Sequence, residues 1–204
     1  NRMSVVEYAL GDGDVKVEGR GVELEGSFQR DGEAIDPREH EGLRKALVVG
    51  MLCGNANLQV REDESEEIES VGEPMEVALL VAGRKAGMKR DALLEEYPEA
   101  REEAFDSDVK MMATFHQGDD GYFVAVKGAP ESVLDACTRI RSNDEVRDLA
   151  DAEREDWKER NDKMAADGLR VLAVATRKAE SADEDPYREL TFLGLIGLLD
   201  PPRE

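Results

Sequence analysis

The stretch "FVAVKGAPESV" (Phe123–Val133) joins an alternating apolar run to a lysine, a glycine and a proline. The alternation predicts a strand, because successive side chains of a strand point to opposite faces. Pro130 is favoured at the first position of a helix, so a helix is expected to begin there. Gly128 lets the backbone approach a neighbour closely. Lys127 thus lies where a strand ends and a helix begins, as a solvated cation or as a cation held beside an anion.

The regions around this stretch predict more strands. A Gly/Asp-rich turn, "GDDG" at 118–121, follows the β-prone run 109–117, so 109–129 is expected to form a hairpin. Residues 169–177 and 189–200 are nearly continuous in apolar residues, as expected for strands covered on both faces. Near the start, "GDGD" is a predicted turn between strands at 3–10 and 15–28.

Helices are predicted from their capping residues. In the segment 35–55, Asp36 is the expected N-cap, Pro37 the first helical residue and Glu39 the reciprocal capping acid. Another helix is expected to begin after Gly72 and to close near Gly87. Further predicted helices are 90–97, 130–137 and 144–166, the last with Leu149, Trp157 and Met164 facing inward and Gly168 at its end. The predicted class is α/β (α+β), in one domain.

The chain of 204 residues is strongly acidic. Asp and Glu number 48 against 27 Lys and Arg, which gives a formal net charge of -21. Nucleic acid and anionic membranes are therefore poor partners for most of the surface. Only 9 of the cations are lysines, so Lys110 and Lys127, which lie beside turns, are candidates to attract an anionic ligand.

Metal and membrane sites are not predicted. The two cysteines, Cys53 and Cys137, and the two histidines, His40 and His116, show no clustered spacing for zinc. No apolar run approaches the roughly 18 to 20 residues that span a bilayer, so direct membrane insertion is not expected. The P-loop, G-x-S-x-G, H-E-x-x-H and kinase motifs are absent from the sequence.

Four short stretches in this order identify a resemblance. They are "GEPMEVALL" (72–80), "FDSDVKMM" (105–112), "VKGAPE" (126–131) and "GLRVLAVATR" (168–177), and "GLLDPPRE" follows them. Together they resemble the nucleotide-binding domain of P-type cation-transporting ATPases, in the type II branch that includes calcium pumps. That fold is a twisted antiparallel sheet flanked by helices. The resemblance implies that 1–204 is a single such domain, with 1–9 and 195–204 as hinge segments to a phosphorylation domain.

The resemblance also implies an ATP site. Phe105 would stack on the adenine, and Glu76 would accept a hydrogen bond from its amino group, although Met75 replaces the family's usual threonine. Lys127 would line the adenine pocket and approach the phosphates, and Lys110 would reach toward the nucleotide. Two further residues complete the expected site, namely Gly128 for close backbone approach and Arg170 for the phosphates.

The expected function follows from the same resemblance. The chain would bind ATP, as Mg-ATP in the intact pump, and deliver the γ-phosphate to an aspartate of the neighbouring phosphorylation domain. It would therefore contain no catalytic residue and would not turn ATP over alone. The expected partners are ATP and the phosphorylation and actuator domains of one parent chain. The expected location is the cytoplasmic side of a plasma-membrane transporter, as a monomeric unit, with calcium the favoured ion.

Two other functions are consistent with the residues. A phosphohydrolase would use acids such as Asp200 together with Lys127, although no Asp-x-Asp nucleophile motif is present. A stand-alone acidic interaction domain would leave its lysines solvated and would not respond to nucleotide.

Overall fold

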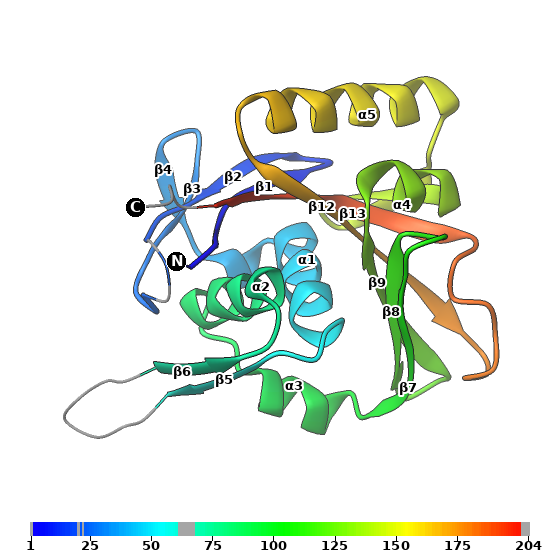
Figure 1. The fold of residues 1–204 in the computed structure, drawn as a ribbon. Helices are drawn as coiled ribbons and strands as arrows, with labels where there is room; N and C mark the ends of the chain where they lie inside the picture. Colours follow the sequence, from blue (N-terminus) through cyan, green and yellow to red (C-terminus); the bar gives the residue numbers. More distant parts are fainter. Residues whose placement is uncertain (1, 20, 22, 61–67, 201–204) are drawn as a thin grey trace.

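A computed structural model describes residues 2–19, 21, 23–60 and 68–200. A large sheet runs through the molecule, and its strands follow the order β4-β3-β2-β1-β13-β12-β9-β8-β7 (Figure 1). The strands of this path are β1 (Ser4–Leu10), β2 (Gly13–Val17), β3 (Phe28–Arg30), β4 (Glu33–Ile35), β7 (Glu99–Asp106), β8 (Met111–Gln117), β9 (Tyr122–Gly128), β12 (Arg170–Ala179) and β13 (Leu190–Leu199).

Two shorter hairpins complete the strands. β10 (Cys137–Ser142) runs parallel to the first part of β13 and pairs with β11 (Glu145–Asp148). β5 (Asn57–Val60) and β6 (Ile68–Val71) form a separate two-stranded sheet. Among the described residues all other pairings are antiparallel. The predicted antiparallel sheet flanked by helices is confirmed.

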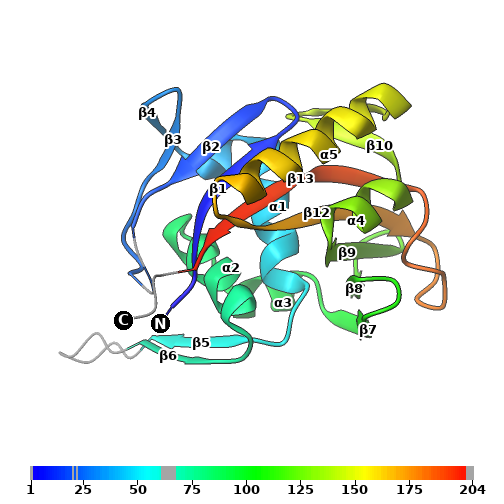
Figure 2. The ribbon, with the colours of Figure 1, turned by 45° about the horizontal axis from the view of Figure 1, so that its top comes forward.

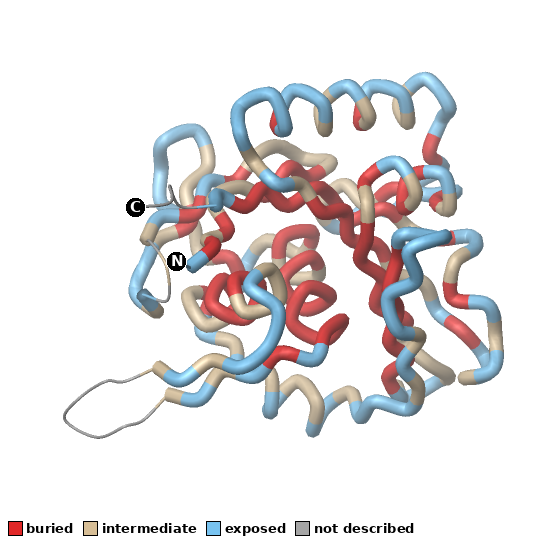
Figure 3. The backbone as a smooth tube through the Cα atoms, viewed as in Figure 1, coloured by how far each residue is buried: buried red, intermediate tan, exposed pale blue. Residues whose placement is uncertain are grey.

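Helices cover both faces of the sheet (Figures 1 and 2). α1 (Glu41–Leu52) and α2 (Pro74–Lys85) pack on one face, with α3 (Arg90–Glu96) beside α1. α4 (Pro130–Ala136) and α5 (Asp151–Ala166) lie on the other face. The alternation along the strands accordingly divides the core: Ala125 and Val174 face α1, whereas Val124, Val126 and Ala173 face α4. β12, β13 and α1 are buried along most of their length (Figure 3).

Several predicted elements are confirmed with small shifts. The hairpin 109–129, the helix at Pro130 and the strands near 169–177 and 189–200 are present as β8, β9, α4, β12 and β13. The glycine that closes α2 is Gly87, whose φ of +78 suits a residue without a side chain. Its N–H donates to Arg84 O at 2.9 Å.

Three element predictions were wrong in part. The strand expected at 15–28 ends at Val17, and a second strand begins only at Phe28. Asp36 does cap a helix, by accepting from the Arg38 N–H at 2.9 Å, but it caps a 3-10 turn, Pro37–Glu39, and α1 begins separately at Glu41. The charged helix expected from 144 begins at Asp151, because residues 145–148 pair with β10 instead.

The two ends of the described chain lie side by side. β1 and β13 are antiparallel neighbours, with Ser4 opposite Leu199. The beginning of β1 and the end of β13 accordingly lie at one side of the molecule (Figure 1). Among the described residues, no helix is long and apolar enough to cross a membrane.

Candidate functional site

An ion pair between Lys127 and Glu76 lies at the end of β9. The Lys127 Nζ is 2.6 Å from Glu76 Oε1, and the two side chains are only 11% and 15% exposed. β9 delivers the lysine, and the first turn of α2 delivers the carboxylate. A charge buried away from water is unfavourable unless it has a partner of opposite charge. The two side chains therefore stabilise each other as an ion pair.

The loop after α1 completes the environment of Glu76. The backbone N–H groups of Asn55 and Ala56 donate to Glu76 Oε2 at 2.9 and 3.0 Å. Gly54 makes room for this carboxylate, because a Cβ there would lie 3.0 Å from its carboxyl carbon. Burial alone raises the pKa of Glu76, but Lys127 and the two N–H donors outweigh it and hold that pKa below its usual value.

Gly128 allows β9 to approach the turn between β7 and β8. A Cβ at Gly128 would meet the Lys110 carbonyl oxygen at 2.4 Å and Met111 Cα at 2.9 Å, distances that no side chain tolerates. The same carbonyl accepts from the Ala129 N–H at 3.0 Å. Lys110 itself has a φ of +57, and its N–H donates to Asp106 O at 2.7 Å. The glycine of "KGAPE" therefore holds the lysine-bearing turn against the end of β9.

Phe105 stands on β7, two strands from Lys127. Met112 of β8 pairs with Lys127, and the register between β7 and β8 shifts at this level, so that Ala104 and Phe105 both lie opposite Met112. With strands about 4.8 Å apart, Phe105 and Lys127 are roughly 10 Å apart at the backbone. The Phe105 side chain is 61% exposed, which is unusual for a large apolar residue. Phe105 and Lys127 therefore place an exposed aromatic ring and a buried cation on nearby strands of one sheet.

Arg170 is not brought into this group. Lys127 pairs with Val174, and Arg170 lies four residues further along β12, about 13 Å at roughly 3.3 Å per residue. Its guanidinium forms an exposed ion pair with Asp200 at 3.2 Å. Five of the six predicted residues thus gather near the end of β9 and the turn beside it, and Arg170 lies nearer the chain ends.

The pairing of Asp200 argues against the phosphohydrolase alternative. Asp200 accepts a hydrogen bond from Arg170. Along the chain it lies six residues after Gly194, the β13 residue opposite Val174, and Val174 in turn is opposite Lys127. That spacing is about 20 Å, so Asp200 and Lys127 cannot act on one phosphate. The interaction-domain alternative expected solvated lysines, but Lys127 is buried and paired.

Buried polar side chains lie along β8, between the level of Lys127 and the opposite end of β9. His116 and Thr114 are fully buried on β8, and their Nε2 and Oγ1 atoms are 2.8 Å apart. His116 Nδ1 is 3.0 Å from the Tyr97 carbonyl oxygen. Burial lowers the pKa of His116, which favours the neutral ring. Cys53 Sγ donates to Met112 O at 3.4 Å, and burial raises the pKa of this thiol to about 12, so it serves packing and not reactivity.

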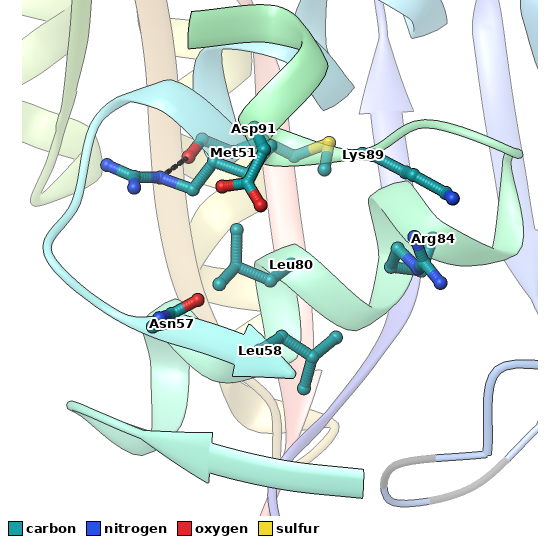
Figure 4. A pocket seen from close by; sticks show the side chains of 8 residues that line it. Met51, Asn57, Leu58, Leu80, Arg84, Lys89 and Asp91 are labelled. Carbon is teal, nitrogen blue, oxygen red and sulfur yellow. Dashed lines mark hydrogen bonds between the residues drawn. The ribbon is translucent and has the colours of Figure 1, made fainter. Parts of the chain in front are cut away.

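A small cavity lies nearby but does not include the predicted residues. It has a volume of about 60 Å³ and lies between α2, α3 and β5 (Figure 4). Arg90 closes it by donating from Nε to Met51 O at 3.0 Å. Ligand pockets are typically ≈ 300–1,000 Å³, so this cavity is too small for a nucleotide. Its lining residues are Met51, Asn57, Leu58, Leu80, Arg84, Lys89, Arg90 and Asp91.

Comparison with known proteins identifies the family. Residues 42–204 match the family described as "P-type ATPase, cytoplasmic domain N". The chain belongs to this family. The predicted resemblance is therefore confirmed, and membership implies nucleotide binding.

The relatives of this N domain are named as cation pumps. The chain is 32% identical to "Calcium-transporting ATPase" of Bacillus subtilis and 36% identical to "Cation-transporting ATPase pma1" of Synechocystis, each match covering 100% of the chain and 23% of the relative. It is 31% identical to human "Calcium-transporting ATPase type 2C member 1", covering 100% of the chain and 21% of the relative. The chain thus spans less than a quarter of these proteins.

Sequence reasoning missed the residues that hold Glu76 in place. Asn55 donates from Nδ2 to Glu102 Oε1 at 2.9 Å, so the loop after α1 also ties β7 to the site. Gly54 followed by Asn55 at a helix end was the available signal, but it indicates a turn and not a partner. Contacts between residues 21 and 47 positions apart depend on the tertiary fold.

Proposed function

We propose that this domain binds ATP at the end of β9 and presents the γ-phosphate to an aspartate of a neighbouring phosphorylation domain. The observation that supports it best is the set of three features within about 10 Å: an exposed Phe105, a buried Lys127 with its partner Glu76, and a backbone approach that only Gly128 permits. An exposed aromatic face at this place is free to stack on a base.

Each residue has a chemical role in the proposed complex. The adenine stacks on Phe105, a contact typically worth about 1 to 3 kcal/mol. Its amino group donates to Glu76, whose lowered pKa keeps the carboxylate an acceptor. The Lys127 ammonium lines the adenine pocket and approaches the phosphates, and Lys110, on the adjoining turn, reaches toward the nucleotide. Arg170, about 13 Å away along β12, takes the far end of the phosphate chain with its bidentate fork.

The transfer itself belongs to the neighbouring domain in this proposal. The role of this chain is positioning, which supplies much of the barrier lowering in phosphoryl transfer. The adjacent strands β1 and β13 carry the hinge segments proposed at 1–9 and 195–204, and hinge closure brings the nucleotide to the aspartate. Magnesium is held mainly by the phosphates and by that other domain, so its removal changes ATP binding by the domain little.

The names of the relatives support a proposal about the parent protein. We propose that the parent protein is an ATP-driven cation pump of the calcium-transporting branch, with this domain on the cytoplasmic side of the membrane. The domain acts as a monomeric unit beside the phosphorylation and actuator domains of its own chain. The transported ion is selected by parts of the protein outside this domain.

Nuclear magnetic resonance on the isotope-labelled domain tests the proposal. ATP at millimolar concentration is expected to shift the amide signals of Glu76, Phe105 and Lys127 saturably, and steady-state hydrolysis is expected to be negligible. Chelating magnesium should leave the affinity nearly unchanged. Unchanged signals at these three residues would overturn the proposed site, and turnover by the isolated domain would overturn the division of labour.

A further inference from the structure

A second region with positive charge lies at the opposite end of β9. A hollow of about 590 Å³ opens around Phe123, four residues before Lys127, and is therefore about 13 Å from the proposed ATP site. It adjoins a smaller hollow of about 260 Å³, and the two share Arg139, Arg177, Lys178 and Thr191. Their combined size suits a small-molecule ligand.

Positively charged residues outnumber negatively charged ones around the two hollows, although the chain as a whole is acidic. Five cations line the two hollows against three acids, whereas acids outnumber bases 48 to 27 in the whole sequence. The cations come from α1, β10 and β12, elements far apart in sequence. They are Lys45, Arg139, Arg141, Arg177 and Lys178, and the acids are Asp119, Asp120 and Glu189.

Several of these cations are incompletely neutralised. Arg139 is exposed and has no side-chain hydrogen bond or ion pair among the described residues. Lys45 lies 3.6 Å from Glu41, whose two carboxylate oxygens already accept from Arg44 at 2.9 and 3.0 Å. Lys45 is also repelled by Arg141, and burial together with this repulsion lowers its pKa.

The remaining cations differ in how completely they are paired with protein groups. Arg141 donates from Nη1 to Asn143 O, but its buried Nε has no partner among the described residues. Lys178 pairs at 2.9 Å with Asp120, which is 93% exposed, so that this pair gains little from burial. Arg177, in contrast, is well paired. Its guanidinium contacts the Glu184 carboxylate and donates to the carbonyl oxygens of two residues in the loop that precedes β13.

We propose that this hollow binds a small phosphate-bearing anion at a site separate from the ATP site. Crowded cations in an otherwise acidic surface are stabilised when a multivalent anion lies between them. The guanidinium of Arg139 offers a fork that matches two phosphate oxygens, and the ammonium of Lys45 offers a compact charge. Thr191, which lies opposite Arg139 where β10 pairs with β13 and also lines the hollow, supplies a hydroxyl donor.

The packing keeps the two sites distinct. The Phe123 ring lies 6.0 Å from that of Tyr97 and 6.2 Å from that of the buried His116, at the opposite end of β9 from Lys127. The fully buried Ala125 lies between Phe123 and Lys127 along the same strand. A ligand in the hollow is therefore not expected to contact the proposed nucleotide site. Its binding and the binding of ATP can fail independently.

Pyrophosphate, which lacks an adenine, is the probe of choice. At constant ionic strength it is expected to shift the amide signals of 118–123, Arg139 and Thr191 saturably in the wild-type domain. Arg139→Gln should weaken that binding at least about fivefold, the scale of one charge-assisted hydrogen bond. Lys163→Gln, on the outer part of α5, removes the same charge and should bind as the wild type does. Phe105→Ala should also leave pyrophosphate binding unchanged.

Other outcomes decide against the inference. It is overturned if the shifts do not saturate, if they centre on Lys127, or if Arg139→Gln and Lys163→Gln weaken binding equally, which would indicate bulk charge only. Vesicles that carry phosphatidic acid, compared with neutral vesicles, distinguish the source of the phosphate group. Saturable pyrophosphate binding with no vesicle binding indicates a soluble ligand, and vesicle binding lost in Arg139→Gln indicates a lipid headgroup in the same hollow.

Discussion

The two ends of β9 differ in how their positively charged side chains are paired. At one end Lys127 is buried against Glu76, and that carboxylate also accepts from two backbone donors. At the other end Lys45, Arg139 and Arg141 surround an open hollow with few acids to neutralise them. The first arrangement is built before any ligand arrives, whereas the second leaves charge available. The two proposed sites thus differ: in one the cation is already paired, and in the other an anion would complete the pairing.

Breaking the buried pair should give the largest effect. Lys127→Met would leave Glu76 without its cation in a site that is 15% exposed, and we expect the free energy of unfolding to fall by about 3 kcal/mol. Lys178→Met is the matched control at the other end, because its side chain and that of its partner Asp120 are 68% and 93% exposed, so that losing this pair should change the free energy of unfolding little. Chemical denaturation measures both, and equal losses would contradict the contrast between the two ends.

Two glycines of one hairpin sharpen the same comparison. Gly128→Ala would place a Cβ 2.4 Å from the Lys110 carbonyl oxygen, so the hairpin must shift at a cost of about 2 kcal/mol. Gly118→Ala, in the turn at the other end of β9, would place its Cβ 3.6 Å from the Gly121 carbonyl oxygen, an ordinary contact. Thermal denaturation should therefore separate the two variants clearly. A Gly128→Ala domain as stable as Gly118→Ala would show that the close approach is not required.

The pH dependence of stability reports on Glu76. Its folded pKa lies below the usual value of 4.5, so its contribution is present above that value and is lost as the pH falls through the lowered pKa. Glu76→Gln should therefore be less stable than the wild type near neutral pH, and the difference should shrink on acidification. Glu131→Gln removes an exposed carboxylate and should show no such convergence. Parallel curves for Glu76→Gln and wild type would contradict the lowered pKa.

The sequence predicted the secondary structure correctly where the local pattern and the tertiary environment favour the same element. The hairpin around "GDDG", the proline that begins α4 and the glycine that ends α2 follow from backbone preferences alone. β7, in contrast, was not predicted, because Glu99–Asp106 is an acidic edge strand without apolar alternation. The β10–β11 hairpin was not predicted either, and β11 lies within the range of the helix expected from 144.

The residues of the proposed site were named from sequence motifs, whereas their spatial arrangement could not be predicted from the sequence. Glu76, Phe105, Lys110, Lys127 and Gly128 were named from motifs, and their gathering depends on strand register. The 2.6 Å contact between Lys127 and Glu76 joins residues 51 positions apart, so no local pattern indicates it. The basic hollow was likewise invisible, because its cations come from three separate elements that only the fold brings together.

Calorimetric titration of ATP into the wild-type domain and into Phe105→Ala tests the central claim most directly. Phe105 is 61% exposed, so its removal should leave the fold intact. The account predicts a loss of at least about 1 kcal/mol in ATP affinity, with pyrophosphate binding unchanged. Val71→Ala, which shortens another exposed apolar side chain, should bind ATP as the wild type does. An ATP affinity equal in Phe105→Ala and wild type would contradict the account.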